Sequence, residues 1–416
     1  MEVYNEIKEL CQRAKASSFS LGTKSTQERN GALLEIAKAL RNGCDEIIKA
    51  NKIDLASAKD NGISDAMLDR LMLNEQRVEG LATAIEAVVS LPDPIGTGTT
   101  FTRPNGLKIE CVSVPLGVVA MIYEARPNVT PDAASLCLKS GNAVVLRGGK
   151  EAINTNKAVV GIIRQALLSV GFDENCVCLV ENTSRDSANA LMEMRGLIDV
   201  LIPRGGKGLI QSVVQNARVP VIETGAGNCH LYVDESADID MAIKVAINAK
   251  CSRPSVCNAI ETILAHKSVA KEFFTRFYEE TRKYSLELRG CPEVCKILPS
   301  ITEATDEDFN TEYDDYIVSC GVVNDVYEAV EHIRKYSTGH SESIITENQR
   351  NADYFVSAID SCSLYVNAST RFTDGGEFGL GAEIGISTQK LHARGPMGLS
   401  ALTTQKYIIK GDGHIR

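Results

Sequence analysis

Residues 118–146 decide the fold class. The apolar run Val-Val-Ala-Met-Ile at 118–122 leads into a polar turn and a helical pattern from Asp132, and a second apolar run, Ala-Val-Val-Leu, follows at 143–146. Short apolar runs that alternate with helix-length segments are typical of parallel strands joined by crossover helices. The segment therefore predicts a doubly wound α/β sheet, which binds ligands at the carboxyl ends of its strands.

The same alternation extends toward the C-terminus. Three further strand-length apolar runs follow at 177–180, 198–202 and 219–222, and a second alternating region runs from Leu231 to Val366. The first ninety residues instead repeat apolar side chains at helical spacing, with polar helix starts near Thr26 and Ser64. Two separate segments, Lys108–Val114 and Tyr407–Lys410, are predicted to be extended.

Composition excludes several classes of function. The 416 residues include 44 Lys and Arg against 54 Asp and Glu, a formal net charge of −10. Such an acidic chain is a poor binder of nucleic acid or anionic membranes. No apolar run approaches the ~18–20 residues of a membrane-spanning helix, and the N-terminus lacks a signal-peptide pattern. We therefore expect a cytoplasmic protein that has neither nucleic-acid nor membrane partners.

Thirteen cysteines raise the question of metal binding, disulfides or catalysis. The odd number, the chain length and the missing export signal favour reduced thiols. The close pairs Cys176/Cys178 and Cys291/Cys295 lack zinc-site spacing, so no metal site is predicted. Cys257 is the candidate nucleophile, because it lies on a predicted loop with Pro254 and a cation, Arg253, that favours the thiolate. The alternative is a buried structural cysteine.

Asn128 follows the first predicted strand, in a segment that precedes a helix. An Asn side chain at this position can donate to an oxyanion. Helix capping by Asn128, Thr130 or Asp132 is the alternative reading.

Two similar basic turns close later strands, Arg147-Gly-Gly-Lys150 and Pro203-Arg-Gly-Gly206. Glycine permits close backbone approach and the cations suit a phosphate, so the two turns together favour a nucleotide. Solvated turns are the alternative.

Glu223, before a Gly-rich turn, is either a general base or a hydrogen-bonded carboxylate at a strand end. His332, His340 and His392 are either substrate contacts or ordinary histidines.

The order of these motifs resembles that of the aldehyde dehydrogenase superfamily, and in detail that of the gamma-glutamyl phosphate reductase (glutamate-5-semialdehyde dehydrogenase) family. The resemblance is specific and covers essentially the whole chain. Its motifs are Val114–Val119, Tyr123–Thr130, Val145–Lys150, Glu223–His230, Cys251–Asn258, Val323–Ile344, Thr370–Gly381 and His392–Gly398. One departure is Pro203-Arg-Gly-Gly206, where the wider superfamily has a Gly-Ser-Thr turn.

The resemblance implies NADPH-dependent reduction of L-glutamyl 5-phosphate to L-glutamate 5-semialdehyde in L-proline biosynthesis. It implies a thioester on Cys257 and an oxyanion held by Asn128 and the Cys257 backbone N–H. Glu223 receives no catalytic role, because a reductase must keep water from its thioester. The implied coenzyme contacts are Arg147, Gly148, Lys150, Pro203, Gly205 and Gly206, with Lys150 suited to a 2′-phosphate. The implied substrate contacts are Arg126, Arg371 and Glu377.

The resemblance also implies three domains and a homo-oligomer, with possible functional coupling to glutamate 5-kinase. Residues 1–103 and 115–228 are expected to bind NADP, and residues 229–374 to carry the catalytic thiol. Residues 104–114 and 375–416 are expected to form an oligomerisation flap and C-terminal tail. Two alternatives stay open: another acyl-phosphate or acyl-CoA reductase of the superfamily, and a catalytically silent NADP-binding or scaffold protein.

Overall fold

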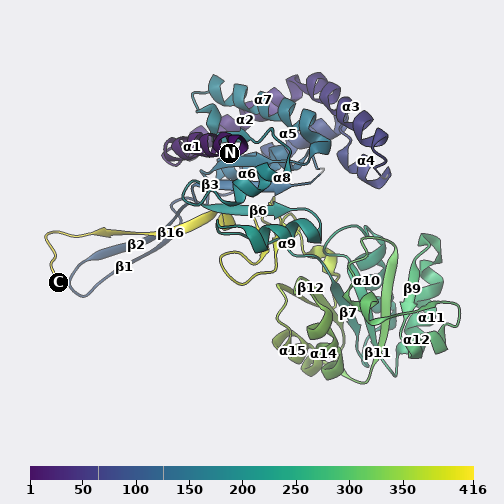
Figure 1. Cartoon of the computed structure of the whole chain (residues 1–416). Coiled ribbons are helices and arrows are strands. Elements are labelled where there is room, and N and C mark those ends of the chain that lie inside the picture. The colour runs from purple at the N-terminus through teal and green to yellow at the C-terminus, as the bar shows by residue number, and fades with distance from the viewer. Residues whose placement is uncertain (64, 125) are drawn as a thin grey trace. The chain divides into compact units, whose positions relative to one another are not determined.

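The computed structural model describes residues 1–63, 65–124 and 126–416, so Ser64, a predicted helix start, lies outside the described residues. The chain forms two compact units (Figure 1). The first unit comprises Met1–Thr224, Gly379–Gly385 and Met397–Arg416. The second comprises Gly225–Phe378 and Ile386–Pro396.

The first unit begins with the predicted helices. They are α1 (Glu2–Leu21), α2 (Thr26–Asn42), α3 (Cys44–Asp60), α4 (Asp65–Leu71) and α5 (Glu75–Ser90). Helix α2 begins at the predicted Thr26, but Ser25 is its cap. The Ser25 side chain accepts from the Glu28 N–H while the Glu28 carboxylate accepts from the Ser25 N–H, which satisfies two helix-end donors.

A four-stranded parallel sheet follows, in the order β5-β4-β3-β6. Its strands are β3 (Val118–Tyr123), β4 (Ala143–Arg147), β5 (Val177–Leu179) and β6 (Val200–Arg204). The connecting elements are α6 (Val129–Lys139), η1 (Lys150–Ala152), α7 (Ile153–Ser169), η2 (Glu174–Cys176), α8 (Arg185–Met192) and α9 (Lys207–Asn216). Val118, Ala120 and Ile122 of β3 join a core with residues of α1 and α8, whereas α6 packs on the opposite face, so the sheet is doubly wound as predicted.

A second, three-stranded antiparallel sheet belongs to the same unit. It has the order β1-β2-β16 and comprises β1 (Gly98–Thr102), β2 (Lys108–Pro115) and β16 (Thr403–Lys410), which follows η5 (Leu399–Leu402). Figure 1 shows these strands as a ribbon that projects from the rest of the unit. The two segments predicted to be extended, Lys108–Val114 and Tyr407–Lys410, pair with each other in this sheet, with Thr404 opposite Val114 and Lys410 opposite Lys108.

The second unit contains a seven-stranded sheet, in the order β10-β9-β11-β8-β7-β12-β13, and all of its strand pairs are parallel. The strands are β7 (Cys229–Val233), β8 (Ile260–His266), β9 (Glu287–Gly290), β10 (Thr302–Glu303), β11 (Ile317–Val323), β12 (Ser341–Ile345) and β13 (Ser363–Val366). The helical elements are α10 (Ile239–Cys251), α11 (Ala270–Thr281), η3 (Arg282–Tyr284), α12 (Pro292–Ile297), α13 (Asp306–Asn310), α14 (Val326–Tyr336), α15 (Gln349–Ala358) and η4 (Thr370–Phe372). A two-stranded sheet pairs β14 (Ile386–Ser387) with β15 (Gly395–Pro396).

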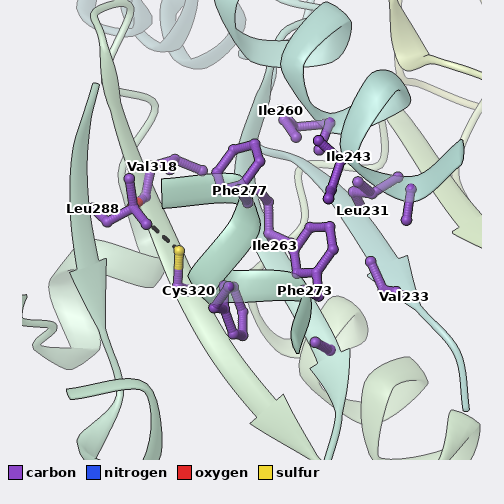
Figure 2. Packing of buried hydrophobic residues seen from close by; sticks show 14 of the residues in the cluster. Leu231, Val233, Ile243, Ile260, Ile263, Phe273, Phe277, Leu288, Val318 and Cys320 are labelled. Carbon is purple, nitrogen blue, oxygen red and sulfur yellow. Dashed lines mark hydrogen bonds between the residues drawn. The ribbon is translucent and has the colours of Figure 1, made fainter. Parts of the chain in front are cut away.

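Apolar side chains on both faces hold this sheet between its helices. Figure 2 shows Phe273 and Phe277 of α11 packed among the strand residues Leu231, Ile263 and Val318, all fully buried. The two phenyl rings are stacked with centroids 5.5 Å apart. On the other face, α14 and α15 contribute to a separate core. The sheet therefore gives a rigid frame to the loops at its edges.

Three details differ from the sequence predictions. Helix α6 begins at Val129 and not Asp132, because Asn128 already occupies the N-cap position. Residues 219–222 form only an isolated bridge, Leu201 to Val221. Strand β1 is exposed along its whole length, so it lacks the apolar alternation that predicts a strand. Within the described part of the chain, no helix is long and apolar enough to cross a membrane.

Candidate active site

The first group of predicted site residues lies at the carboxyl edge of the four-stranded sheet. Asn128 follows β3, Arg147 ends β4 and the residues to Lys150 follow it, and Pro203 to Gly206 end β6 or follow it. Because β3 is hydrogen-bonded to both β4 and β6, these three loops are neighbours. The fold thus brings together the predicted oxyanion donor and the two predicted phosphate turns.

Asn128 is exposed, and its side chain does not cap α6. Its amide Nδ2 donates instead to Asp132 Oδ2 at 3.3 Å. Burial raises the pKa of Asp132 to about 6, although this hydrogen bond and the charge of Arg204 both lower it. The Asn128 side chain therefore does not cap the helix, which was the alternative reading. The carboxyl group of Asp132, one helical turn further on, holds this side chain instead.

The β4 turn rests on a buried polar network. The Tyr123 hydroxyl bonds to Thr130 Oγ1 at 2.7 Å, and Thr130 Oγ1 donates to Asn156 Oδ1 at 2.8 Å. The Asn156 Nδ2 is buried without a partner among the described residues, and a Cβ on Gly148 would lie only 2.2 Å from it. Position 148 therefore requires glycine, and a buried donor lies directly against this turn.

The two cations of this turn differ in their surroundings. Arg147 is half-buried, and its Nη2 donates to the carbonyl oxygens of Thr183 at 2.7 Å and Ser184 at 3.0 Å. Burial lowers the pKa of Arg147, while the charge of Glu151 raises it. Lys150 is exposed in η1. Arg147 thus holds the loop that precedes α8, and Lys150 is the more accessible charge for a ligand.

Helices α7 and α9, which both begin at this edge, have different surroundings at their first residues. Asp54 of α3, 2% exposed, accepts from the Asn154 N–H at 3.2 Å and the Thr155 N–H at 2.8 Å, at the start of α7. At the start of α9, a Cβ on Gly206 would come no closer than 3.9 Å to another residue, and one on Gly208 would meet nothing within 4 Å. There is thus room beside these glycines for a phosphate group, although the Gly206 N–H itself already donates to the Glu124 carboxylate.

Glu124 fixes the turn that leads into α9. Its Oε2 accepts from the Gly206 N–H at 2.8 Å, and a Cβ on Gly205 would lie 2.6 Å from its Cδ. Pro203 is buried in β6, and its carbonyl accepts from Thr224 Oγ1 at 2.7 Å. Arg126 and Glu223 are half-buried in the same unit. The space beside Gly206 and Gly208 fits the pyrophosphate of a dinucleotide coenzyme.

Cys257 lies in the second unit, on the loop between α10 and β8. This loop is at the amino edge of the seven-stranded sheet, beside the segment that precedes β7. A Cβ on Gly227 would lie 1.6 Å from the Cys257 carbonyl oxygen and 2.5 Å from its Cα. Only glycine permits this approach. The Gly227 N–H donates to Glu312 Oε1 at 2.7 Å, so the segment that packs against the Cys257 loop is itself held in place.

The neighbouring thiols differ from Cys257 in exposure. Cys257 is half-buried, whereas Cys251 and Cys229 are 5% and 0% exposed. Burial raises the pKa of Cys251 to about 11 and that of Cys229 well above its ordinary value. The Cys229 thiol donates to the Cys257 carbonyl at 3.2 Å, which further fixes the loop. A thiol with a high pKa is a poor nucleophile, so Cys257 is the candidate of the three.

Hydrogen bonds join the η4 turn to Asn258, the residue that follows Cys257. Asn258 Nδ2 donates to the carbonyls of Arg371 at 3.2 Å and Thr373 at 3.0 Å, and Thr370 Oγ1 donates to the Asn258 carbonyl at 2.6 Å. The structure thus brings Arg371 beside the Cys257 loop. Glu377 is exposed, and its N–H donates to Asp374 Oδ1 at 3.4 Å.

Of the three candidate histidines, His332 and His340 are largely buried and His392 is exposed. Burial lowers the pKa of His332 to about 3 and that of His340 to about 4, so both are neutral near pH 7. A third histidine, His230, is fully buried, with its Nδ1 3.1 Å from Glu342 Oε2. His392 has a positive φ of 68°. In the described residues, no group of three or more His, Cys, Asp or Glu side chains could hold a metal ion.

Sequence reasoning missed Glu124, Asp54, Asn156 and Gly227 as parts of this machinery. Glu124 and Gly227 lie inside the motifs Tyr123–Thr130 and Glu223–His230, but roles were predicted only for other residues of these motifs. Asp54 and Asn156 act through contacts with distant or buried partners, and a single sequence carries no signal for such contacts.

Comparison with known proteins agrees with this geometry. The sequence profile of the aldehyde dehydrogenase family matches residues 3–315. The gamma-glutamyl phosphate reductase of Heliobacterium modesticaldum is 55% identical over 417 aligned residues, covering 100% of both chains. That of Clostridium perfringens strain SM101 is 54% identical, covering 99% of this chain and 100% of the relative.

Solved structures give the same picture. The crystal structure of gamma-glutamyl phosphate reductase from Thermotoga maritima has a TM-score of 0.97 at 49% identity, covering 99% of this chain and 100% of that one. An acetylating aldehyde dehydrogenase from Geobacillus thermoglucosidasius shares the fold, with a TM-score of 0.71 at 17% identity and coverage of 100% of this chain and 98% of that one. The chain therefore belongs to the aldehyde dehydrogenase family and, within it, to the branch of the gamma-glutamyl phosphate reductases.

Proposed function

We propose that this chain is an oxidoreductase that converts L-glutamyl 5-phosphate to L-glutamate 5-semialdehyde with release of phosphate, a step of L-proline biosynthesis. Family membership supports the reaction class, and full-length relatives at 54–55% identity that carry the reductase name support the substrate. The observation that carries the chemistry is the half-buried Cys257 on a loop backed by Gly227, beside two buried thiols.

The Cys257 thiolate attacks the acyl carbon, and phosphate leaves as the thioester forms. We assign the Asn128 side chain and the Cys257 backbone N–H to the oxyanion that develops during this attack. The Asn128 amide is exposed and oriented by Asp132, which supports this role. Arg126, Arg371 and Glu377 are the proposed substrate contacts, and the Arg371 side chain bonds to Ser252 and Asn258 of the Cys257 loop.

The first unit supplies the proposed coenzyme site. When bound, a nicotinamide coenzyme supplies the hydride that reduces the thioester to the aldehyde. The open start of α9, with Gly205 and Gly206, suits the pyrophosphate, and Arg147, Gly148 and Pro203 shape the adjoining turns. We propose NADPH as the coenzyme, because the exposed Lys150 suits a 2′-phosphate.

We also propose roles for the domains. Residues 1–103 and 115–228 bind the coenzyme, 229–374 carry the thiol, and 104–114 with 375–416 serve assembly into a homo-oligomer in the cytoplasm. The exposed Tyr407 and Ile409 on β16 support an assembly role for that strand. We also propose a functional link to glutamate 5-kinase, because phosphorylation of a carboxylate by a kinase yields an acyl phosphate.

The test is a steady-state assay of phosphate-dependent NADP reduction by glutamate semialdehyde. Cys257→Ala should lose several powers of ten in rate, as expected for loss of a covalent nucleophile. Cys251→Ala is the matched control and should stay within about tenfold of the wild-type rate. Activity retained by Cys257→Ala would refute the nucleophile. Turnover of acyl-CoA in place of glutamyl phosphate would favour the alternative reductase class.

A further inference from the structure

Two arginines, one on the Cys257 loop and one bonded to it, lie near the candidate nucleophile. Arg253 is four positions before Cys257 on the same loop and is exposed. Arg371 comes from η4 and is half-buried. Of the ion pairs formed by the described residues, none includes either arginine. One cation is enough to favour a thiolate, so the second requires its own explanation.

Hydrogen bonds hold Arg371 across the loop. Its Nε donates to Ser252 Oγ at 3.2 Å, and its Nη1 donates to Asn258 Oδ1. Ser252 and Asn258 are the residues that flank the intervening segment 253–257. The guanidinium therefore joins both ends of the loop, and its backbone is fixed in turn by the amide of Asn258.

Arg253 and Cys257 are the first and last residues of the segment whose two flanking residues, Ser252 and Asn258, bond to the Arg371 guanidinium, so both lie beside this guanidinium. Burial and the positive charge of Arg253 lower the pKa of Arg371, while the negative charges of Asp374 and Cys257 raise it. The Asp374 carboxylate is engaged with the N–H groups of Gly376 at 2.8 Å and Glu377 at 3.4 Å. Two cations that repel each other beside a reacting thiol form a site that an anion would stabilise.

We propose that Arg253 and Arg371 bind the phosphate group that leaves when Cys257 attacks the acyl phosphate. This inference rests on the proposed function. In the step, the Cys257 sulfur forms a bond to the acyl carbon, and the bond from that carbon to the bridging phosphate oxygen breaks. The electron pair stays on that oxygen, and the phosphate takes up a proton from water. Two guanidinium groups stabilise the charge that develops on the leaving group.

The leaving phosphate fits this position better than the α-carboxylate of the substrate. The phosphate oxygen is bonded to the carbon that Cys257 attacks, whereas three carbons separate that carbon from the α-carboxylate. The phosphate also carries more charge than a carboxylate, which suits two arginines. The site thus deepens the assignment of Arg371 as a substrate contact and adds Arg253.

Kinetics in the phosphorolytic direction test the proposal. Arg253 is exposed, so Arg253→Gln should fold normally. We expect its KM for inorganic phosphate to rise roughly ten- to a hundredfold, with its KM for semialdehyde within about twofold of wild type. Arg253→Lys keeps the positive charge but loses the two-pronged guanidinium, so its KM for phosphate should fall between those of wild type and Arg253→Gln. Arg350→Gln, the same charge change on the exposed start of α15, is the matched control and should leave both KM values unchanged.

An unchanged phosphate KM in Arg253→Gln would overturn the proposal. A raised semialdehyde KM would then assign the arginines to the α-carboxylate.

Alkylation of Cys257 gives a readout that does not require turnover. Inorganic phosphate should slow the reaction of iodoacetamide with Cys257 in the wild type, and this protection should be lost in Arg253→Gln but kept in Arg350→Gln. Protection that is absent in the wild type, or that survives in Arg253→Gln, would contradict the site. If wild type shows the protection but no phosphate-dependent turnover, the proposed function fails while the anion site stands.

Discussion

At the scale of single residues, we propose that the charge of Lys150 decides the preference of the enzyme for NADPH over NADH. Lys150→Glu replaces an exposed cation by a carboxylate that can accept from ribose hydroxyls. A charge-assisted contact is worth ~1.5–3 kcal/mol, so the preference for NADPH over NADH should fall roughly ten- to a hundredfold in kcat/KM. Lys49→Glu, an exposed change on α3, is the control. An unchanged ratio would mean that another cation, such as Arg147, selects the coenzyme.

Asp132 is the residue whose titration should be visible in stability. Its pKa of about 6 in the folded protein lies above the ~3.9 of an exposed aspartate, so the folded state holds the proton more tightly. Its stabilising contribution is complete below about pH 4 and is lost as the pH rises through about 6. Asp132→Asn has no carboxylate to desolvate, so it should be more stable than wild type at pH 8, by about 3 kcal/mol.

Denaturant unfolding of both proteins at pH 4.5 and pH 8 measures this effect. The difference between Asp132→Asn and wild type should be larger at pH 8. If the two proteins show the same pH dependence, the carboxyl group of Asp132 is not desolvated as the structure has it.

At the scale of elements, the approach of the Gly227 segment to the Cys257 loop holds the thiol in place. In Gly227→Ala, the added Cβ would fall 1.6 Å from the Cys257 carbonyl oxygen, so the loop must move. A displacement of about 1 Å in a catalytic group can cost about a hundredfold in rate. We expect kcat to fall at least that far while the far-ultraviolet circular dichroism stays native.

Gly161→Ala is the control for this substitution, because a Cβ there meets nothing within 4 Å in the middle of α7. It should keep full activity and gain about 0.5–1 kcal/mol of stability. Native kcat in Gly227→Ala would show that the close approach does not fix the catalytic loop.

The elements that could be predicted from the sequence are those with strong periodicity. The runs at 118–122 and 143–146 became β3 and β4, because buried parallel strands are continuously apolar. Strand β1 was missed because all five of its residues are exposed. For the site, Cys257 and the glycine turns were visible as motifs. The contacts of Asp54 with Thr155 or of Gly227 with Cys257 join positions distant in the chain, so they required the fold.

At the scale of the whole molecule, the β1–β2–β16 ribbon should serve assembly. Strand β16 pairs with β2 along eight residues, from Thr403 to Lys410, and it exposes Tyr407 and Ile409 at 58% and 56%. Deletion of the residues after Gln405 removes most of β16 and bares the edge of β2, and exposed strand edges tend to pair with other chains. The oligomeric mass in light scattering should fall, and solubility should decrease.

Any loss of activity in this truncation should follow dissociation, since Cys257 and its loop belong to the second unit. A dilution series that compares mass and activity checks the order of events. A truncated protein with the full oligomeric mass would make the tail a surface appendage.

The central claim is that Cys257 carries the acyl group. Intact-protein mass spectrometry after mixing with glutamate semialdehyde and NADP, without phosphate, tests it most directly, because the thioester then has no phosphate to accept its acyl group. The account predicts one added glutamyl group per chain, mapped to Cys257, absent in Cys257→Ala and discharged when phosphate is added. A glutamyl group on another residue, or none at all in an enzyme that turns over with phosphate, would contradict it.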